Sequence, residues 1–117
     1  MATVERSSLV LRGVLDVCLL AVLEDRAVYG YELGQRLADL ALPVAAGSIY
    51  PLLARLERQG LVDTETRPSV RGPARKYYVL TGQGRRTLSE GRVEWKAITS
   101  AVDAVLVPAG SPAPTAL

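Results

Sequence analysis

Cationic side chains gather in one short stretch of this chain, and their shared chemistry is phosphate binding. Residues 67–92 carry seven basic residues and a single acid, whereas residues 1–66 carry six basic and nine acidic residues. A local excess of positive charge is the electrostatic footprint of a nucleic-acid-binding surface, although a solvated surface rich in arginine has the same composition. The basic residues are Arg67, Arg71, Arg75, Lys76, Arg85, Arg86 and Arg92.

Catalytic chemistry has few residues to use. The chain contains no histidine and one cysteine, Cys18. These counts exclude a Ser/His or Cys/His nucleophile and a His/Cys metal cluster. The glycines at 82 and 84 lack the rest of a phosphate-binding loop. Only carboxylates remain for a hydrolase, and they are scattered over predicted helix surfaces. We therefore expect no enzyme, no cofactor and no metal, and we interpret Cys18 as a small core residue.

Apolar residues at helical spacing predict three helices before the basic stretch. They cover about 8–24, 31–40 and 46–59, with Gly60 as the C-terminal cap of the third. Because only a few residues separate the second helix from the third, the two form a helix-turn-helix. Pro51 is unusual inside a helix, so either the third helix starts near Ser48 or it bends at Pro51.

The hydrophobic period then changes to the alternation of strands. Residues 61–66 and 75–80 predict two strands joined by a turn rich in proline and glycine, which together form a β-hairpin. Thr81 is a suitable N-cap for a last helix extending to about 107. Along this helix a heptad pattern predicts a seam that pairs with another helix. The seam consists of Leu88, Gly91, Trp95, Ile98, Val102 and Val105.

Two helices followed by a basic hairpin predict a winged helix-turn-helix. Its third helix can enter a major groove while the hairpin tip reaches an adjacent phosphate strand or minor groove. Small residues lie opposite the leucine face of that helix, where they allow close approach to DNA. The alternative is that Arg55 and Arg58 only pair with Glu57 or Asp63 on a solvated face. The predicted DNA-binding residues are Ser48, Tyr50, Arg55, Arg58, Arg71, Arg75 and Lys76.

Three motifs resemble the PadR family of transcriptional regulators. They are VYGYEL at 28–33, GSIYPLLARLERQGLV at 47–62 and RKYYVLTGQG at 75–84, in family order and at family-like spacing. The single helix that follows resembles the short-tailed subfamily. The resemblance implies a homodimer on an inverted-repeat operator, with repression relieved by a ligand. It also implies that Tyr50 and the basic hairpin residues bind DNA. The family often has Ser or Asn at the N-cap of the recognition helix, where this chain has Val44-Ala45-Ala46.

The last helix combines a predicted dimer interface with a possible effector site. Trp95 is either an anchor of the dimer core or a plate on which a planar aromatic ligand stacks. Gly91 is expected to leave space beside the indole. Asp16 either forms an ion pair with Arg12, four residues earlier, or lines the site and favours a cationic or hydrogen-bonding ligand. Arg92 favours an anionic ligand, so the charge of the ligand stays open. The predicted effector site contains Asp16, Leu20, Gly91, Trp95 and Thr99. The predicted dimer interface contains Leu11, Leu15, Leu88, Trp95, Ile98, Val102 and Val105.

The predicted fold class is mainly α with a small β-hairpin, a winged helix-turn-helix plus a long C-terminal dimerisation helix. We expect a DNA-binding domain over 1–80, a dimerisation helix over 81–107 and a disordered tail over 108–117. The apolar stretch at 14–23 is too short to span a bilayer, so we expect a cytoplasmic protein without membrane contact. A winged-helix adaptor that binds a ligand or a protein, and not DNA, is the alternative.

Overall fold

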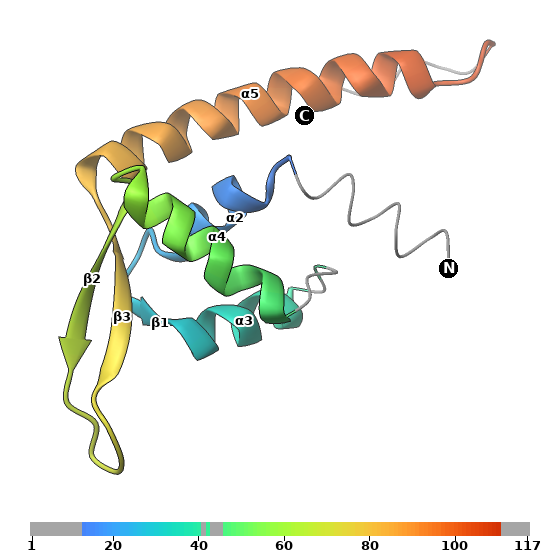
Figure 1. Ribbon diagram of the computed structural model, residues 1–117. Coiled ribbons are helices and arrows are strands. Elements are labelled where there is room, and N and C mark those ends of the chain that lie inside the picture. Colours follow the sequence, from blue (N-terminus) through green and yellow to red (C-terminus); the bar gives the residue numbers. More distant parts are fainter. Residues whose placement is uncertain (1–12, 41, 43–45, 111–117) are drawn as a thin grey trace.

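The computed structural model describes residues 13–40, 42 and 46–110. Their order of helices and strands confirms the predicted winged helix-turn-helix (Figure 1). Residue 8, where the first helix was expected to begin, lies outside the described residues, as do 111–117 of the predicted tail. The elements are α2 (Leu15–Val22), β1 (Val28–Tyr29), α3 (Gly30–Asp39), α4 (Ala46–Arg58), β2 (Val62–Arg67), β3 (Arg75–Leu80) and α5 (Gly82–Leu106).

The bounds of α4 test one of the two alternatives predicted for Pro51, a helix that starts near Ser48. The helix begins at Ala46, two residues before Ser48, so Pro51 lies inside it. Proline has no N–H to donate to the carbonyl four residues earlier, which here belongs to Gly47. Pro51 is exposed and therefore belongs to the outer face of α4, not to the face against the core.

The three strands form one antiparallel sheet in the order β1-β3-β2. β2 and β3 pair from Val62 opposite Leu80 to Arg67 opposite Arg75, as expected for a hairpin. β1 was not predicted. It has two residues and pairs through Val28 with Tyr78 of β3. A strand of two residues is too short for alternation to reveal it.

The core lies between the helices and one face of the sheet. Leucines of α2, α3 and α4 meet there, and β2 contributes Val62 and β3 contributes Leu80. Burial raises the pKa of the half-buried Cys18 thiol, and the nearby Asp16 carboxylate raises it further, which suits a packing residue. The buried leucines and isoleucine of the helices, with Leu23 at the C-cap of α2, are Leu19, Leu20, Leu23, Leu33, Leu37, Ile49, Leu53, Leu56 and Leu88.

The start of α5 is fixed to the rest of the domain by a cap and an ion pair. The Thr81 hydroxyl accepts a hydrogen bond from Gly84 N at 2.9 Å and donates to the Gly60 carbonyl at 2.7 Å, which confirms Thr81 as the N-cap. Further along α5, the Arg92 guanidinium donates to both carboxylate oxygens of Glu24, at 3.0 and 2.8 Å. These hydrogen bonds hold the pKa of Glu24 below its usual value. After Arg92, α5 extends away from the core as a largely exposed arm (Figure 1).

Candidate nucleic-acid interface

One face of α4 is buried and the opposite face is exposed. Ile49, Leu53 and Leu56 are each at most 2% exposed, because they pack into the core. The opposite face presents small residues, hydroxyls and two arginines to solvent. The exposed residues are Gly47, Ser48, Tyr50, Pro51, Ala54, Arg55 and Arg58. The structure therefore places all four predicted α4 residues on exposed surface.

The two arginines of α4 are not paired with the acids that were expected as alternative partners. Within 13–40, 42 and 46–110, neither Arg55 nor Arg58 has an ion pair or a hydrogen bond from its side chain. Glu57 is engaged elsewhere: it accepts from the Thr64 hydroxyl at 3.3 Å and lies 3.9 Å from Lys76 Nζ. The guanidinium groups of Arg55 and Arg58 therefore keep their donors for a ligand.

The hairpin tip carries Arg71, whose side chain is exposed. The tip is held by the Ser69 hydroxyl, which donates to the Arg71 carbonyl at 3.0 Å, and by Gly72, whose φ of +99° favours glycine. The tip projects away from α5 (Figure 1). Arg71 is exposed and has no ion pair among the described residues, so its charge is available to a phosphate.

Arg75 and Lys76, both predicted to bind DNA, lie on opposite faces of the sheet. Neighbouring residues of a strand point to opposite sides. The Arg75 guanidinium lies 4.6 Å from the ring centroid of Tyr29 on the outer face. Lys76 lies near Glu57 and 5.6 Å from the ring centroid of Tyr78, on the core side. The two cations therefore lie on different sides of the hairpin.

Two tyrosines and two arginines form a stack on the outer face of the sheet. The rings of Tyr29 and Tyr77 have their centroids 5.6 Å apart, and Arg67 lies 4.6 Å from the ring centroid of Tyr77. With Arg75 on Tyr29, the stack links all three strands close to the turn of the hairpin, where Arg67 pairs with Arg75. Contacts of this kind contribute about 0.5–1 kcal/mol each at exposed sites. Sequence reasoning included neither the tyrosines nor Arg67 in the site, although alternation in 75–80 places Arg75 and Tyr77 on one face.

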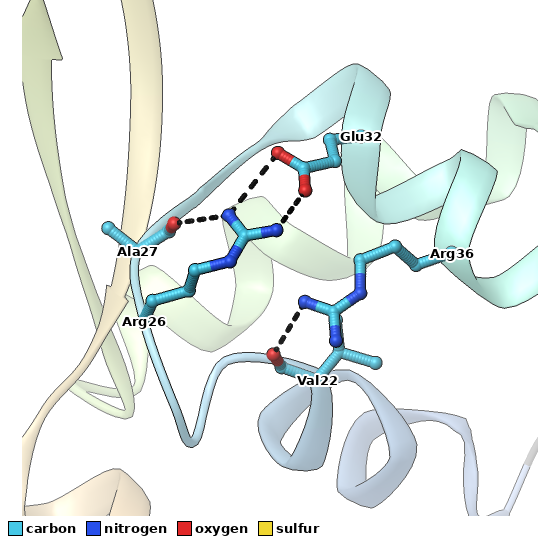
Figure 2. A network of polar contacts seen from close by, with 5 residues as sticks. All are labelled: Val22, Arg26, Ala27, Glu32 and Arg36. Carbon is cyan, nitrogen blue, oxygen red and sulfur yellow. Dashed lines mark hydrogen bonds and ion pairs between the residues drawn. The ribbon is translucent and has the colours of Figure 1, made fainter.

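A second polar network fixes α3, the first helix of the helix-turn-helix (Figure 2). The Arg26 guanidinium forms an ion pair with Glu32 and donates to the Ala27 carbonyl at 3.3 Å. Its hydrogen bonds hold the pKa of Glu32 below the usual value. One turn further along the same face of α3, Arg36 donates to the Val22 carbonyl of α2 at 3.4 Å. Figure 2 shows both guanidinium groups bridging α3 to the segment that leaves α2.

The predicted effector residues do not all line one space. Leu20 is fully buried in the core. The expectation of open space at Gly91 was wrong, because a Cβ there would lie 2.8 Å from Val17 Cγ2, so the glycine allows α2 and α5 to approach. Trp95 is 47% exposed. The Thr99 hydroxyl donates to the carbonyl of Trp95 at 2.8 Å, and Asp16 accepts from Val17 N at 2.9 Å.

The predicted dimer residues divide into buried and exposed groups. Leu88 is 1% exposed in the single chain, so it belongs to the core of the protomer and not to a surface that a partner covers. Leu15 is partly buried against the same core, and Leu11 lies outside the described residues. The other seam residues form an exposed apolar stripe on α5: Trp95 is 47%, Ile98 56%, Val102 45% and Val105 82% exposed.

Among the described residues, the structure has no helix long and apolar enough to cross a membrane. In the same part of the chain, no group of three or more His, Cys, Asp or Glu side chains is arranged to hold a metal ion.

Comparison with known proteins agrees with this architecture. The family model of the PadR-like transcriptional regulators matches residues 19–90. The transcriptional regulator Rv3488 of Mycobacterium tuberculosis is 38% identical over 81 residues, which cover 69% of this chain and 75% of the relative. A PadR-like regulator of Bacillus cereus superimposes with a TM-score of 0.75 at 37% identity, covering 84% of this chain and 96% of the other. For a PadR family regulator of Eggerthella lenta the TM-score is 0.76 at 39% identity, with coverage of 86% and 90%. The chain therefore belongs to the PadR-like family of DNA-binding, winged-helix transcriptional regulators.

Proposed function

We propose that the protein represses transcription as a homodimer bound to an inverted-repeat operator. α4 would lie in the major groove, and the hairpin tip would contact a neighbouring phosphate strand or the minor groove. The observation that supports this most strongly is the exposed face of α4. It combines small residues with Arg55 and Arg58, whose side chains have no acidic partner among the described residues.

A homodimer is supported by the apolar stripe on α5. Trp95, Ile98, Val102 and Val105 step along the arm at heptad spacing and are 45–82% exposed in the single chain. Burying such a stripe against its own copy removes it from water and provides a two-fold axis. The two α4 helices of the dimer then need a spacing of about 34 Å, one turn of DNA, to enter successive major grooves.

The repressor would act in the cytoplasm and would be released by a planar small molecule at the dimer interface. With Leu20 and Gly91 committed to packing within one chain, the proposed site is lined by Asp16, Trp95 and Thr99. Arg92 already pairs with Glu24, which leaves Asp16 as the charged group of the proposed site and supports a cationic ligand. Arg12, the predicted alternative partner of Asp16, lies outside the described residues. Binding between the two arms would change the angle between the winged domains and so the spacing of the α4 helices.

Replacing Arg71 with alanine tests the hairpin as a phosphate contact. We expect the slope of log affinity against log salt to fall by about 0.9 for each lost contact, hence about 1.8 for the two hairpins of a dimer. Fluorescence anisotropy on a duplex covering the promoter of the protein's own gene measures this slope. Arg86→Ala is the matched control, since Arg86 belongs to the same basic stretch but lies on α5, away from the hairpin tip (Figure 1). Equal slopes for the two variants would contradict the proposed role of the hairpin.

The emission of Trp95 tests the effector site. Because Trp95 is the only tryptophan, its fluorescence reports on this position alone. We expect a planar aromatic cation to quench the emission and to release the protein from the promoter duplex over the same range of concentration. A panel of planar cations, anions and neutral compounds provides the comparison. If no compound quenches Trp95 and DNA binding is unchanged, Trp95 serves only in packing.

A further inference from the structure

Gly30 is the first residue of α3, and its backbone does not require glycine. Gly60, Gly72 and Gly110 are the described glycines with a positive φ, and Gly30 is not among them. Alanine is the better helix former at a helical position, because it loses less backbone entropy. The presence of glycine at this position therefore needs a cause outside the local backbone.

The cause is the ring of Tyr50 on α4. A Cβ at position 30 would lie 2.7 Å from Tyr50 Cε1, 3.4 Å from its hydroxyl oxygen and 3.5 Å from Cζ. The first of these distances is too short for any real contact between carbons. Tyr50 is 52% exposed, so its ring has solvent to move into. A side chain at position 30 would thus displace the ring of Tyr50 while leaving the core in place.

We propose that Gly30 is a positioning residue for DNA binding. Because it has no side chain, the ring of Tyr50 can pack against its backbone. The backbone of Gly30 limits the orientations open to this ring, so the phenol is held in one orientation on the exposed face of α4. A side chain that is already oriented loses less conformational entropy when it binds. The inference rests on the proposed function and on the predicted role of Tyr50, which lies on the exposed face of α4 that would meet the operator.

α3 offers a matched control one turn further along. A Cβ at Gly34 would have one neighbour, Ile49 Cδ1, at an ordinary van der Waals distance of 3.7 Å. Gly30→Ala and Gly34→Ala therefore make the same chemical change in the same helix, and both improve helix propensity. Only the first meets Tyr50.

The experiment compares the full-length wild type with Gly30→Ala, Gly34→Ala, Tyr50→Ala and the Gly30→Ala/Tyr50→Ala double variant. Anisotropy on a fluorescein-labelled duplex of the protein's own promoter gives the affinity. We expect Gly30→Ala to weaken binding about a hundredfold, as does Tyr50→Ala, since each removes one hydrogen bond to a charged group from each chain of the dimer, at about tenfold per bond. Gly34→Ala should bind like the wild type. The double variant should bind no more weakly than Tyr50→Ala, because both changes remove the same contact.

Two further measurements separate positioning from damage to the fold. Thermal unfolding should show Gly30→Ala to be as stable as Gly34→Ala. NMR spectra of protein with isotope-labelled tyrosine, recorded without DNA, report on the ring of Tyr50. Its resonances should shift in Gly30→Ala and not in Gly34→Ala. Unchanged Tyr50 resonances, or wild-type affinity of Gly30→Ala where Tyr50→Ala is weakened, overturn the proposal. A Gly30→Ala chain that unfolds unless Tyr50 is also removed overturns it as well. If Tyr50→Ala binds with wild-type affinity, Tyr50 does not contact the operator, and this inference is wrong for that reason.

Discussion

The free energy of unfolding of Gly84→Ala is expected to be about 3 kcal/mol below that of the wild type. This loss is in the upper part of the range for overpacked sites. A Cβ at this position would lie 2.1 Å from the Leu61 carbonyl oxygen and 2.7 Å from Leu80 Cδ1. The first of these atoms belongs to the backbone and has no rotamer by which to move aside. The same carbonyl accepts a hydrogen bond from Thr81 N at 3.2 Å, so a shift also disturbs the cap of α5.

Urea denaturation followed by circular dichroism measures the change, and Gly82→Ala is its control. Gly82 lies two residues earlier in the same helix, and a Cβ there would meet nothing nearer than Arg86 Nη1 at 3.8 Å. We expect Gly82→Ala to be as stable as the wild type, or more stable by up to about 1 kcal/mol. If Gly84→Ala is as stable as Gly82→Ala, the close approach of α5 to the Leu61 carbonyl is incorrect.

The second large effect is expected from Ile98→Asp on the arm of α5. In the proposed dimer the substitution places a carboxylate in the apolar seam of each chain, where it loses its hydration without gaining a partner. We expect the protein to become a monomer. Operator affinity should then fall about a hundredfold or more, because each chain binds one half-site without the gain from being linked to a second.

Size-exclusion chromatography with light scattering gives the mass, and anisotropy gives the affinity. Val93→Asp is the matched control: Val93 is 69% exposed on the same helix but lies outside the heptad seam. It should leave the mass and the affinity unchanged. A dimeric Ile98→Asp chain would show that α5 does not pair through this stripe.

Local patterns predicted most of the fold. Helical periodicity placed α3 and α4 to within about one residue, and the cap residue Thr81 gave the start of α5, because these features depend on neighbours in the sequence. The pattern also showed which face of α4 is buried. Exposure of Ser48, Tyr50, Arg55 and Arg58 followed from the same periodicity.

Features that depend on distant contacts were not predictable. The gap expected at Gly91 is filled by Val17, and Leu88 is buried by its own chain. The sequence pattern does not distinguish a seam that faces α2 from one that faces a second subunit. The ion pair of Glu24 with Arg92 joins residues 68 positions apart. The reason for glycine at position 30 also becomes visible only when α4 is placed against α3.

The most direct test of a sequence-specific regulator is an anisotropy titration on two duplexes of equal length and composition. One contains the inverted repeat from the promoter of the protein's own gene, and the other contains a shuffled sequence. We predict saturation at two chains per inverted repeat, an affinity about a thousandfold or more above that for the shuffled duplex, and a steep loss of binding as salt is raised. Equal affinity for the two duplexes, or no binding to either at low salt, would contradict a repressor that reads its operator through α4 and the hairpin.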